Sequence, residues 1–175
     1  ATRAAIDEDG WFHTGDAGYL KNGELFLTDR IKDLFKTSNG KYIAPQMIES
    51  KLVVDRYIDQ IVVIADQRKF VSALIVPERH HIRFTDTADL CRNADINKML
   101  LFRINTLQQE FAHYEQVKRI TLLPEPFSME KGELTNTLKV KRPVVNRNYA
   151  SEIEAMYVED TPPEVPCPPP VTPSV

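Results

Sequence analysis

The sequence predicts an α+β fold, a small mixed domain with β-hairpins and a short central sheet packed by helices. Strand-like and helix-like stretches follow each other in a mixed order, unlike the strict alternation of a doubly wound sheet. Two Asn-Gly pairs stand between apolar runs, and one long segment repeats apolar residues at helical spacing. With 42% hydrophobic and 27% charged residues among 175, the chain can bury a real core.

The first third of the chain is rich in turns. Asn22-Gly23 and Asn39-Gly40 each separate two apolar runs. Because Asn-Gly readily adopts the positive φ angles of a tight hairpin turn, we expect two successive hairpins. These hairpins cover residues 19–27 and 34–44.

The segment DRIKDLFKTSNGK, residues 29–41, reads as a strand that runs into a turn. Side chains of a strand alternate between two faces, so Arg30, Lys32 and Lys36 would share one face. That cationic face suits a phosphate, a ribose or a cofactor. It equally suits a solvated edge strand, where lysines block aggregation. Taken alone, the segment favours the solvated edge.

A helix, a strand pair and a longer helix are expected next. Pro45 suits the first turn of a short helix. Two apolar stretches joined by polar residues, 58–66 and 70–78, read as paired strands. A helix with one buried face is expected from Asn93 to about Tyr114. Its apolar stripe consists of Ile96, Leu100, Ile104, Leu107 and Phe111.

The last part of the chain combines a strand, a helix and a tail. Residues 117–124 read as a strand, and a helix is expected after Pro143. Seven of the last fourteen residues are proline, so the chain from Pro162 should be extended and poorly ordered.

Composition excludes several classes of protein. The net charge of −3 gives no general attraction to nucleic acid or anionic membranes. Cys91 and Cys167 lie far apart and indicate neither a disulfide framework nor a metal cluster, so a cytoplasmic location is the default. His80-His81 has no further ligand at a metal-like spacing, and we expect no metal site. The start of the chain, without Met or a signal peptide, is what we expect of a fragment.

The peptide GWFHTGDAGYL, residues 10–20, is the first that can carry chemistry. Thr14, Gly15 and Asp16 predict a sharp turn with a carboxylate at its apex. A carboxylate can accept hydrogen bonds from two adjacent hydroxyls, which a ribose offers. The alternative is an ordinary turn in which Asp16 caps its own backbone, and the peptide alone favours that alternative.

The second such peptide is LTNTLKVKRP, residues 134–143, which follows a polar loop. A lysine on a flexible loop can be carried into an active site formed elsewhere, where one such donor is worth about 3–4 kcal/mol of barrier. Lys139, Lys141 and Arg142 are the candidates. The alternative is an ordinary basic start of a helix.

In this order, GWFHTGD, LTDRIKDLFKTSNGKYIAPQMIE and LTNTLKVKRP resemble the C-terminal part of the adenylate-forming, or AMP-binding, enzymes. The likeness covers about residues 9–158 and is greatest to the long-chain fatty acyl-CoA synthetases, or long-chain-fatty-acid–CoA ligases. It implies the fold of their small C-terminal domain. It also implies their reaction, in which a fatty acid and ATP form an acyl-AMP and coenzyme A then displaces AMP.

The resemblance implies roles for residues of the first two motifs. Asp16 and Arg30 would bind the ribose of the nucleotide. Lys32 would be the hinge about which the small domain rotates between adenylation and thioester formation. After the rotation, Lys36 would be presented to the active site, and Gly40 would line the tunnel for the pantetheine of coenzyme A.

In the third motif, the resemblance implies that Lys139 is the catalytic lysine of adenylation. Leu138 replaces the glycine that precedes this lysine in the commoner pattern, as in many long-chain synthetases. Lys141 stays open as the alternative position of the catalytic lysine.

The resemblance also implies a division of the chain. Residues 1–29 would end the large N-terminal AMP-binding domain, 30–160 would form the mobile C-terminal domain, and 161–175 a disordered tail. Fatty acid, ATP with Mg2+ and coenzyme A are the implied substrates and cofactors, with Mg2+ and most ATP contacts outside this fragment, which alone should be inactive.

Two alternatives stay open, an acyl-AMP ligase that loads a carrier protein and a non-catalytic nucleotide- or CoA-binding module. Peripheral contact of the full-length protein with a membrane also stays open.

Overall fold

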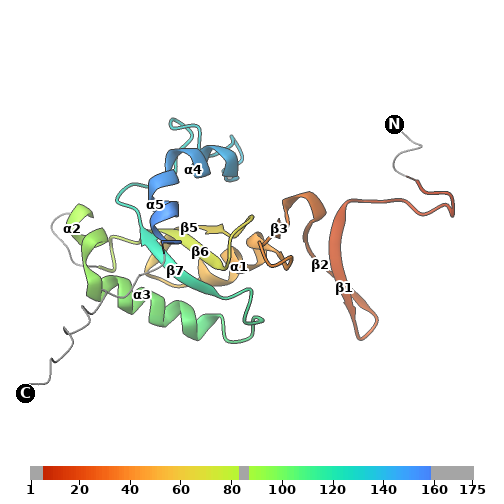
Figure 1. Ribbon diagram of the computed structural model, residues 1–175, viewed down its shortest axis with the longest axis horizontal. Helices are drawn as coiled ribbons and strands as arrows, with labels where there is room; N and C mark the ends of the chain where they lie inside the picture. Colours follow the sequence, from red (N-terminus) through yellow and green to blue (C-terminus); the bar gives the residue numbers. More distant parts are fainter. Residues whose placement is uncertain (1–5, 83–86, 159–175) are drawn as a thin grey trace, which may run out of the picture.

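The computed structural model describes residues 6–82 and 87–158, and it shows a β-hairpin that projects from an α+β body (Figure 1). Two antiparallel hairpins open this part of the chain, as predicted. Their strands are β1 (Asp16–Lys21), β2 (Glu24–Arg30), β3 (Phe35–Lys36) and β4 (Tyr42–Ile43). The φ angles of 53° at Asn22 and 82° at Gly23 are those that a tight hairpin turn requires.

The connection between the hairpins differs from the strand that the pattern of residues 29–41 predicts. β2 ends at Arg30, and a 3-10 helix, η2 (Ile31–Asp33), follows it. Arg30 pairs with Asp16, where β1 begins, and beyond that pair the Ile31 N–H still donates to the Gly15 carbonyl at 2.8 Å. After Ile31 the backbone bonds locally, since the Leu34 N–H donates to the carbonyls of Arg30 and Ile31 at 3.2 and 3.3 Å. The prediction of one continuous cationic strand was wrong.

The body is built on a three-stranded sheet of order β5-β6-β7. Strands β5 (Ile58–Ile64) and β6 (Val71–Pro77) pair antiparallel, as predicted. Strand β7 (Val117–Leu122) lies parallel to β6. Because parallel neighbours need a crossover connection, the chain between them has room for α2 (Thr87–Arg92) and α3 (Ala94–Leu107).

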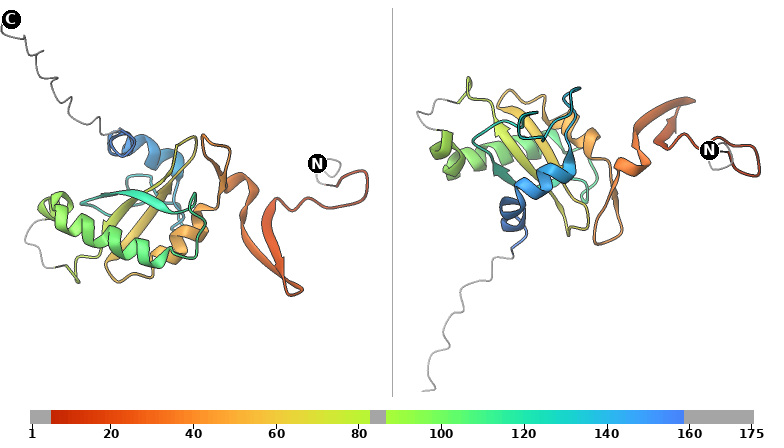
Figure 2. Two further views of the ribbon diagram at one scale, coloured as in Figure 1. Left: turned by 60° about the horizontal axis from the view of Figure 1, so that its bottom comes forward. Right: turned by 90° about the horizontal axis from the view of Figure 1, so that it is seen from above.

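Helices cover both faces of this sheet, and the body has three layers (Figures 1 and 2). The outer layers are α1 (Pro45–Leu52) with α3, and α4 (Arg142–Asn148) with α5 (Ala150–Ala155). Val63 of β5 shares a buried cluster with Leu100 of α3. The preceding residue, Val62, shares the other buried cluster with Val145 of α4. The alternation of the pleated strand therefore supplies both cores.

The helix boundaries differ from those predicted. Asn93 caps α3 by accepting from the N–H groups of the second and third residues after it, at 2.9 and 3.2 Å, but the helix ends at Leu107 and not near Tyr114. Helix α2 was not predicted. The helix expected after Pro143 begins one residue earlier and breaks at Tyr149 into α4 and α5.

The predicted proline-rich tail lies outside the described residues. Among the helices of residues 6–82 and 87–158, none combines the length and apolar character needed to cross a bilayer.

Candidate functional site

The turn at residues 14–16 and the end of β2 bring Asp16 and Arg30 together. The Asp16 N–H donates to Thr14 Oγ1 at 3.1 Å, and Gly15 has a φ of 78°. Across the hairpin, Arg30 Nε donates to Asp16 Oδ1 at 2.8 Å. The Asp16 side chain keeps 28% of its surface exposed and that of Arg30 58%, so a hydroxyl-bearing ligand can reach both.

A cleft of about 790 Å³ lies between η2, α1 and the loop that precedes α4. Lys32 from η2 and Lys139 from the loop both line it, so the structure brings the predicted hinge and the predicted catalytic lysine to one site. Lys141 and Arg142 add two further cations, against the two carboxylates of Asp33 and Glu49. The lining is therefore net positive and suits a phosphate-bearing ligand.

Lys139 stands on a short loop, residues 134–140, which we call the lysine loop. Its first and last residues form an isolated antiparallel bridge. The Thr135 N–H donates to the Lys139 carbonyl at 2.8 Å, and the Lys139 N–H donates to Thr135 Oγ1 at 3.0 Å. Leu138 has a φ of 59°, a left-handed conformation that glycine adopts at lower cost. The backbone of Lys139 is thus held on both sides while its side chain is exposed.

Lys36 and Gly40 lie on the β3–β4 hairpin and do not line this cleft. Thr37 is buried and closes the loop, since its N–H donates to the Lys41 carbonyl at 2.9 Å and its Oγ1 accepts from the Lys41 N–H at 3.1 Å. Gly40 has a φ of 76°, and an added Cβ would meet nothing within 4 Å. Lys36 is exposed, with its Nζ 5.9 Å from the centre of the Tyr42 ring.

A partly buried ion pair between Glu49 and Arg142 was not predicted. Two N–H groups of Arg142 donate to the two carboxylate oxygens of Glu49, each at 2.9 Å, and the side chains are 19% and 15% exposed for Arg142 and Glu49. Glu49 also accepts from the Val63 N–H at 2.7 Å, and the guanidinium lies 5.1 Å from the Phe35 ring centre. The pair ties the first residue of α4 to α1 and fixes the end of the lysine loop.

The predicted site residues therefore form three groups. Asp16 and Arg30 share the projecting β1–β2 hairpin, Lys32 and Lys139 share the cleft, and Lys36 and Gly40 lie on the β3–β4 hairpin. Within the described ranges, no three His, Cys, Asp or Glu side chains gather closely enough to hold a metal ion.

An α+β body with a lysine loop on a cationic cleft and a separate glycine loop, preceded by an Asp–Arg pair, agrees with the C-terminal part of an adenylate-forming enzyme that the motifs predict. Residues 32–161 match the family described as AMP-binding enzyme C-terminal domain, and the chain belongs to this family. The predicted family and fold class are confirmed.

Curated relatives agree with this assignment. The chain is 38% identical over 168 residues to Long-chain-fatty-acid–CoA ligase 1 of Homo sapiens, covering 89% of this chain and 24% of that protein. It is 36% identical over 173 residues to the peroxisomal Long chain acyl-CoA synthetase 7 of Arabidopsis thaliana, covering 90% and 24%. The chain therefore spans about a quarter of the length of these relatives.

Solved structures share the fold. The A domain of carboxylic acid reductase from Segniliparus rugosus, in complex with AMP and a co-purified carboxylic acid, superposes with a TM-score of 0.72 at 27% identity. That match covers 89% of this chain and 24% of the other. A Mycobacterium tuberculosis fatty acyl CoA synthetase superposes with a TM-score of 0.52 at 21% identity, covering 86% and 26%, and supports the fold alone.

Proposed function

We propose that this chain is the C-terminal domain of a long-chain fatty acyl-CoA synthetase. The whole enzyme activates a fatty acid with ATP to acyl-AMP and then transfers the acyl group to coenzyme A. The observation that carries the proposal is that one body bears two separate loops, with Lys139 and Lys32 both lining the cationic cleft and Gly40 on the β3–β4 hairpin. In this proposal residues 1–29 belong to the large domain, and residues 30–160 rotate against it.

The chemistry of the two half-reactions explains why two loops are needed. Adenylation brings a carboxylate against a triphosphate, and these anions repel each other. The ammonium group of Lys139 is a compact cation with three N–H donors that can bridge them. The thiol of coenzyme A then needs access to the acyl-AMP. Rotation about Lys32 would withdraw Lys139 and present Lys36 and the Gly40 loop.

The nucleotide would bind through the projecting hairpin. The exposed Asp16 carboxylate can accept hydrogen bonds from both ribose hydroxyls, and Arg30 beside it fixes the orientation of that carboxylate. We expect Mg2+ to arrive bound to the phosphates of ATP and to be held by residues outside this chain.

A second candidate is an acyl-AMP ligase that passes the acyl group to a carrier protein. It is supported by the 26% identity and TM-score of 0.71 to the A-PCP didomain of a carboxylic acid reductase. Thioester formation with free coenzyme A favours the synthetase, and its absence in the presence of acyl-AMP favours the carrier alternative. A non-catalytic module predicts no acyl-AMP formation by the full-length protein.

The proposal is tested on the full-length protein with Lys139→Ala and Lys141→Ala. Lys139→Ala should slow fatty-acid-dependent ATP–pyrophosphate exchange by about 100–1000-fold, because one preorganised cation is lost from the transition state. Thioester formation from preformed acyl-AMP should change far less. A larger loss in Lys141→Ala would move the catalytic role to Lys141. The 175-residue chain alone should show no exchange, and measurable exchange would contradict the proposed division.

A further inference from the structure

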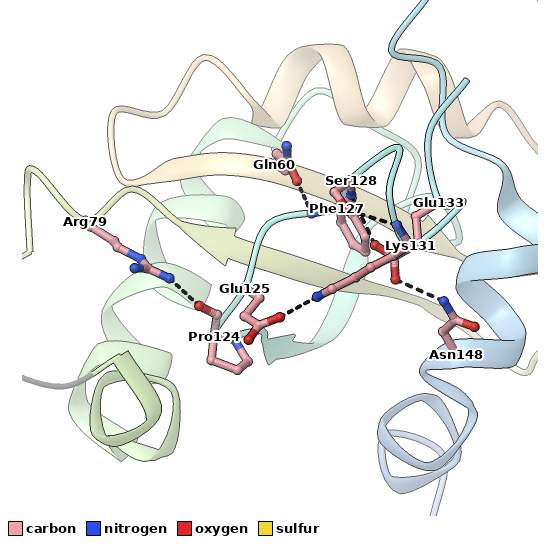
Figure 3. A network of polar contacts seen from close by, with 9 residues as sticks. All are labelled: Gln60, Arg79, Pro124, Glu125, Phe127, Ser128, Lys131, Glu133 and Asn148. Atoms are coloured by element: carbon pink, nitrogen blue, oxygen red, sulfur yellow. Dashed lines mark hydrogen bonds and ion pairs between the residues drawn. The ribbon is translucent and has the colours of Figure 1, made fainter. Parts of the chain in front are cut away.

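Glu133 is a buried carboxylate at the base of the lysine loop, and the two half-reactions described above do not use it (Figure 3). Glu133 exposes only 1% of its surface. Burial of a carboxylate is costly unless hydrogen bonds compensate for the lost water. The contacts of Glu133 therefore indicate what the fold gains from it.

The carboxylate joins two segments that flank the lysine loop. Glu133 Oε1 accepts from Asn148 Nδ2 at 3.1 Å, and Glu133 Oε2 accepts from the Ser128 N–H at 3.2 Å. Ser128 precedes the loop, and Asn148 ends α4 behind it. Both partners are donors, so an acceptor-only carboxylate matches both at once. Figure 3 shows Glu133 lying between them.

The backbone of Glu133 closes the same junction. Its N–H donates to the Ser128 carbonyl at 3.0 Å, and its carbonyl accepts from the Lys141 N–H at 2.7 Å. The loop that carries Lys139 lies directly beyond these two bonds. Burial of the Tyr149 side chain, together with the neighbouring negative charge of Glu133, raises the pKa of Tyr149 to about 12. The side chain and the backbone of Glu133 thus both hold the junction at the base of the lysine loop.

We propose that Glu133 is a positioning residue for adenylation, which holds the base of the lysine loop between Ser128 and Asn148. This inference rests on the proposed function. The loop is exposed at its tip, so its orientation is set at its base. A catalytic cation that is misplaced by about 1 Å can cost about 100-fold in rate. The thioester half-reaction uses the Gly40 hairpin, which Glu133 does not contact in the bonds described above.

Glu133→Gln in the full-length protein tests the inference. The new amide oxygen can accept from the Ser128 N–H or from Asn148, and the new NH2 group faces the other partner, where Asn148 keeps a bond only if its own amide turns so that Oδ1 accepts. In either arrangement the acceptor loses its negative charge, and charge-assisted hydrogen bonds are about twice as strong as neutral ones. Fatty-acid-dependent ATP–pyrophosphate exchange should fall about 10–100-fold. Thioester formation from preformed acyl-AMP should stay close to the wild-type rate.

A reciprocal exchange provides the rescue. In Glu133→Gln combined with Asn148→Asp, the new amide oxygen can accept from Ser128 N–H, and the new NH2 group can donate to the carboxylate at position 148. Pyrophosphate exchange should return most of the way to the wild-type rate. Asn148→Ala, at an exposed residue, removes one of the two hydrogen bonds to the Glu133 carboxylate. It should lower pyrophosphate exchange but not thioester formation, and by a smaller factor than Glu133→Gln.

Glu125→Gln is the matched control, because it breaks an exposed ion pair with Lys131 on the same connection and should alter neither half-reaction (Figure 3). Equal losses in both half-reactions for Glu133→Gln, or a wild-type exchange rate for Asn148→Ala, would overturn the positioning role. So would failure of the reciprocal exchange to restore activity at an unchanged melting temperature. Absence of acyl-AMP formation by the unaltered full-length protein would instead refute the proposed function.

Discussion

Arg142→Ala is expected to destabilise the domain by about 3 kcal/mol. The substitution removes two charge-assisted hydrogen bonds of 2.9 Å from the Glu49 carboxylate. The carboxylate keeps the hydrogen bond from the Val63 N–H. Breaking a buried ion pair typically costs about 3–5 kcal/mol because one charge stays buried without its partner. The side chains of Arg142 and Glu49 are 19% and 15% exposed, which places this pair at the lower end.

Urea denaturation of the 175-residue chain, followed by circular dichroism, measures this loss as a lower midpoint at constant slope. A fall of about 6–12 °C in melting temperature should accompany it. Lys51→Ala is the matched control, because it removes an exposed ion pair with Glu110 that should contribute less than about 1 kcal/mol. Equal effects of Arg142→Ala and Lys51→Ala would show that the buried pair does not anchor α4.

Three further predictions concern single side chains. Gln108→Leu should cost about 2–3 kcal/mol in urea denaturation, since the buried amide of Gln108 donates to the Val117 carbonyl at 3.0 Å and accepts from its N–H at 2.8 Å. Gln109→Leu, at the exposed neighbour, should change stability by less than about 0.5 kcal/mol, and equal effects would contradict the bond. Gly40→Ala should cost about 1–2 kcal/mol from its left-handed backbone alone, and a much larger loss would reveal a steric clash. The pKa of Tyr149 is raised from 10.0 to about 12, so the unfolded chain releases this proton first and stability should fall as pH rises from 10 towards 12. Tyr149→Phe should reduce this loss of stability in thermal melts recorded between pH 10 and 12. The same pH dependence of the melting temperature in both proteins would contradict the raised pKa of Tyr149.

Local signals predicted most elements correctly. Asn22-Gly23 has both positive φ angles of a tight turn, and Pro45 opens α1 as its fixed φ favours. The apolar spacing within α3 marks its buried face, where Leu100 and Ile104 are fully buried. These signals depend on residues a few positions apart, which is why sequence alone reveals them.

Features that depend on distant contacts were not predictable. The helical spacing of apolar residues continues to Phe111, but α3 ends at Leu107. The side chain of the next residue, Gln108, binds the backbone of Val117. Alternation at residues 29–41 suggests a strand, yet no local rule reveals that the backbone turns to local hydrogen bonds after Ile31. The three motifs contain every predicted site residue, whereas the pairing of Glu49 with Arg142 joins two motifs far apart in the chain.

The two half-reactions of the full-length protein, measured separately for Lys139→Ala and Gly40→Leu, test the central claim most directly. The two variants should affect opposite half-reactions. Lys139→Ala should slow acyl-AMP formation by about 100–1000-fold and largely spare thioester formation. Gly40→Leu should slow thioester formation and largely spare acyl-AMP formation, with Gly40→Ala reporting the backbone strain alone. If each variant lowers both half-reactions by the same factor, the two loops do not serve separate steps.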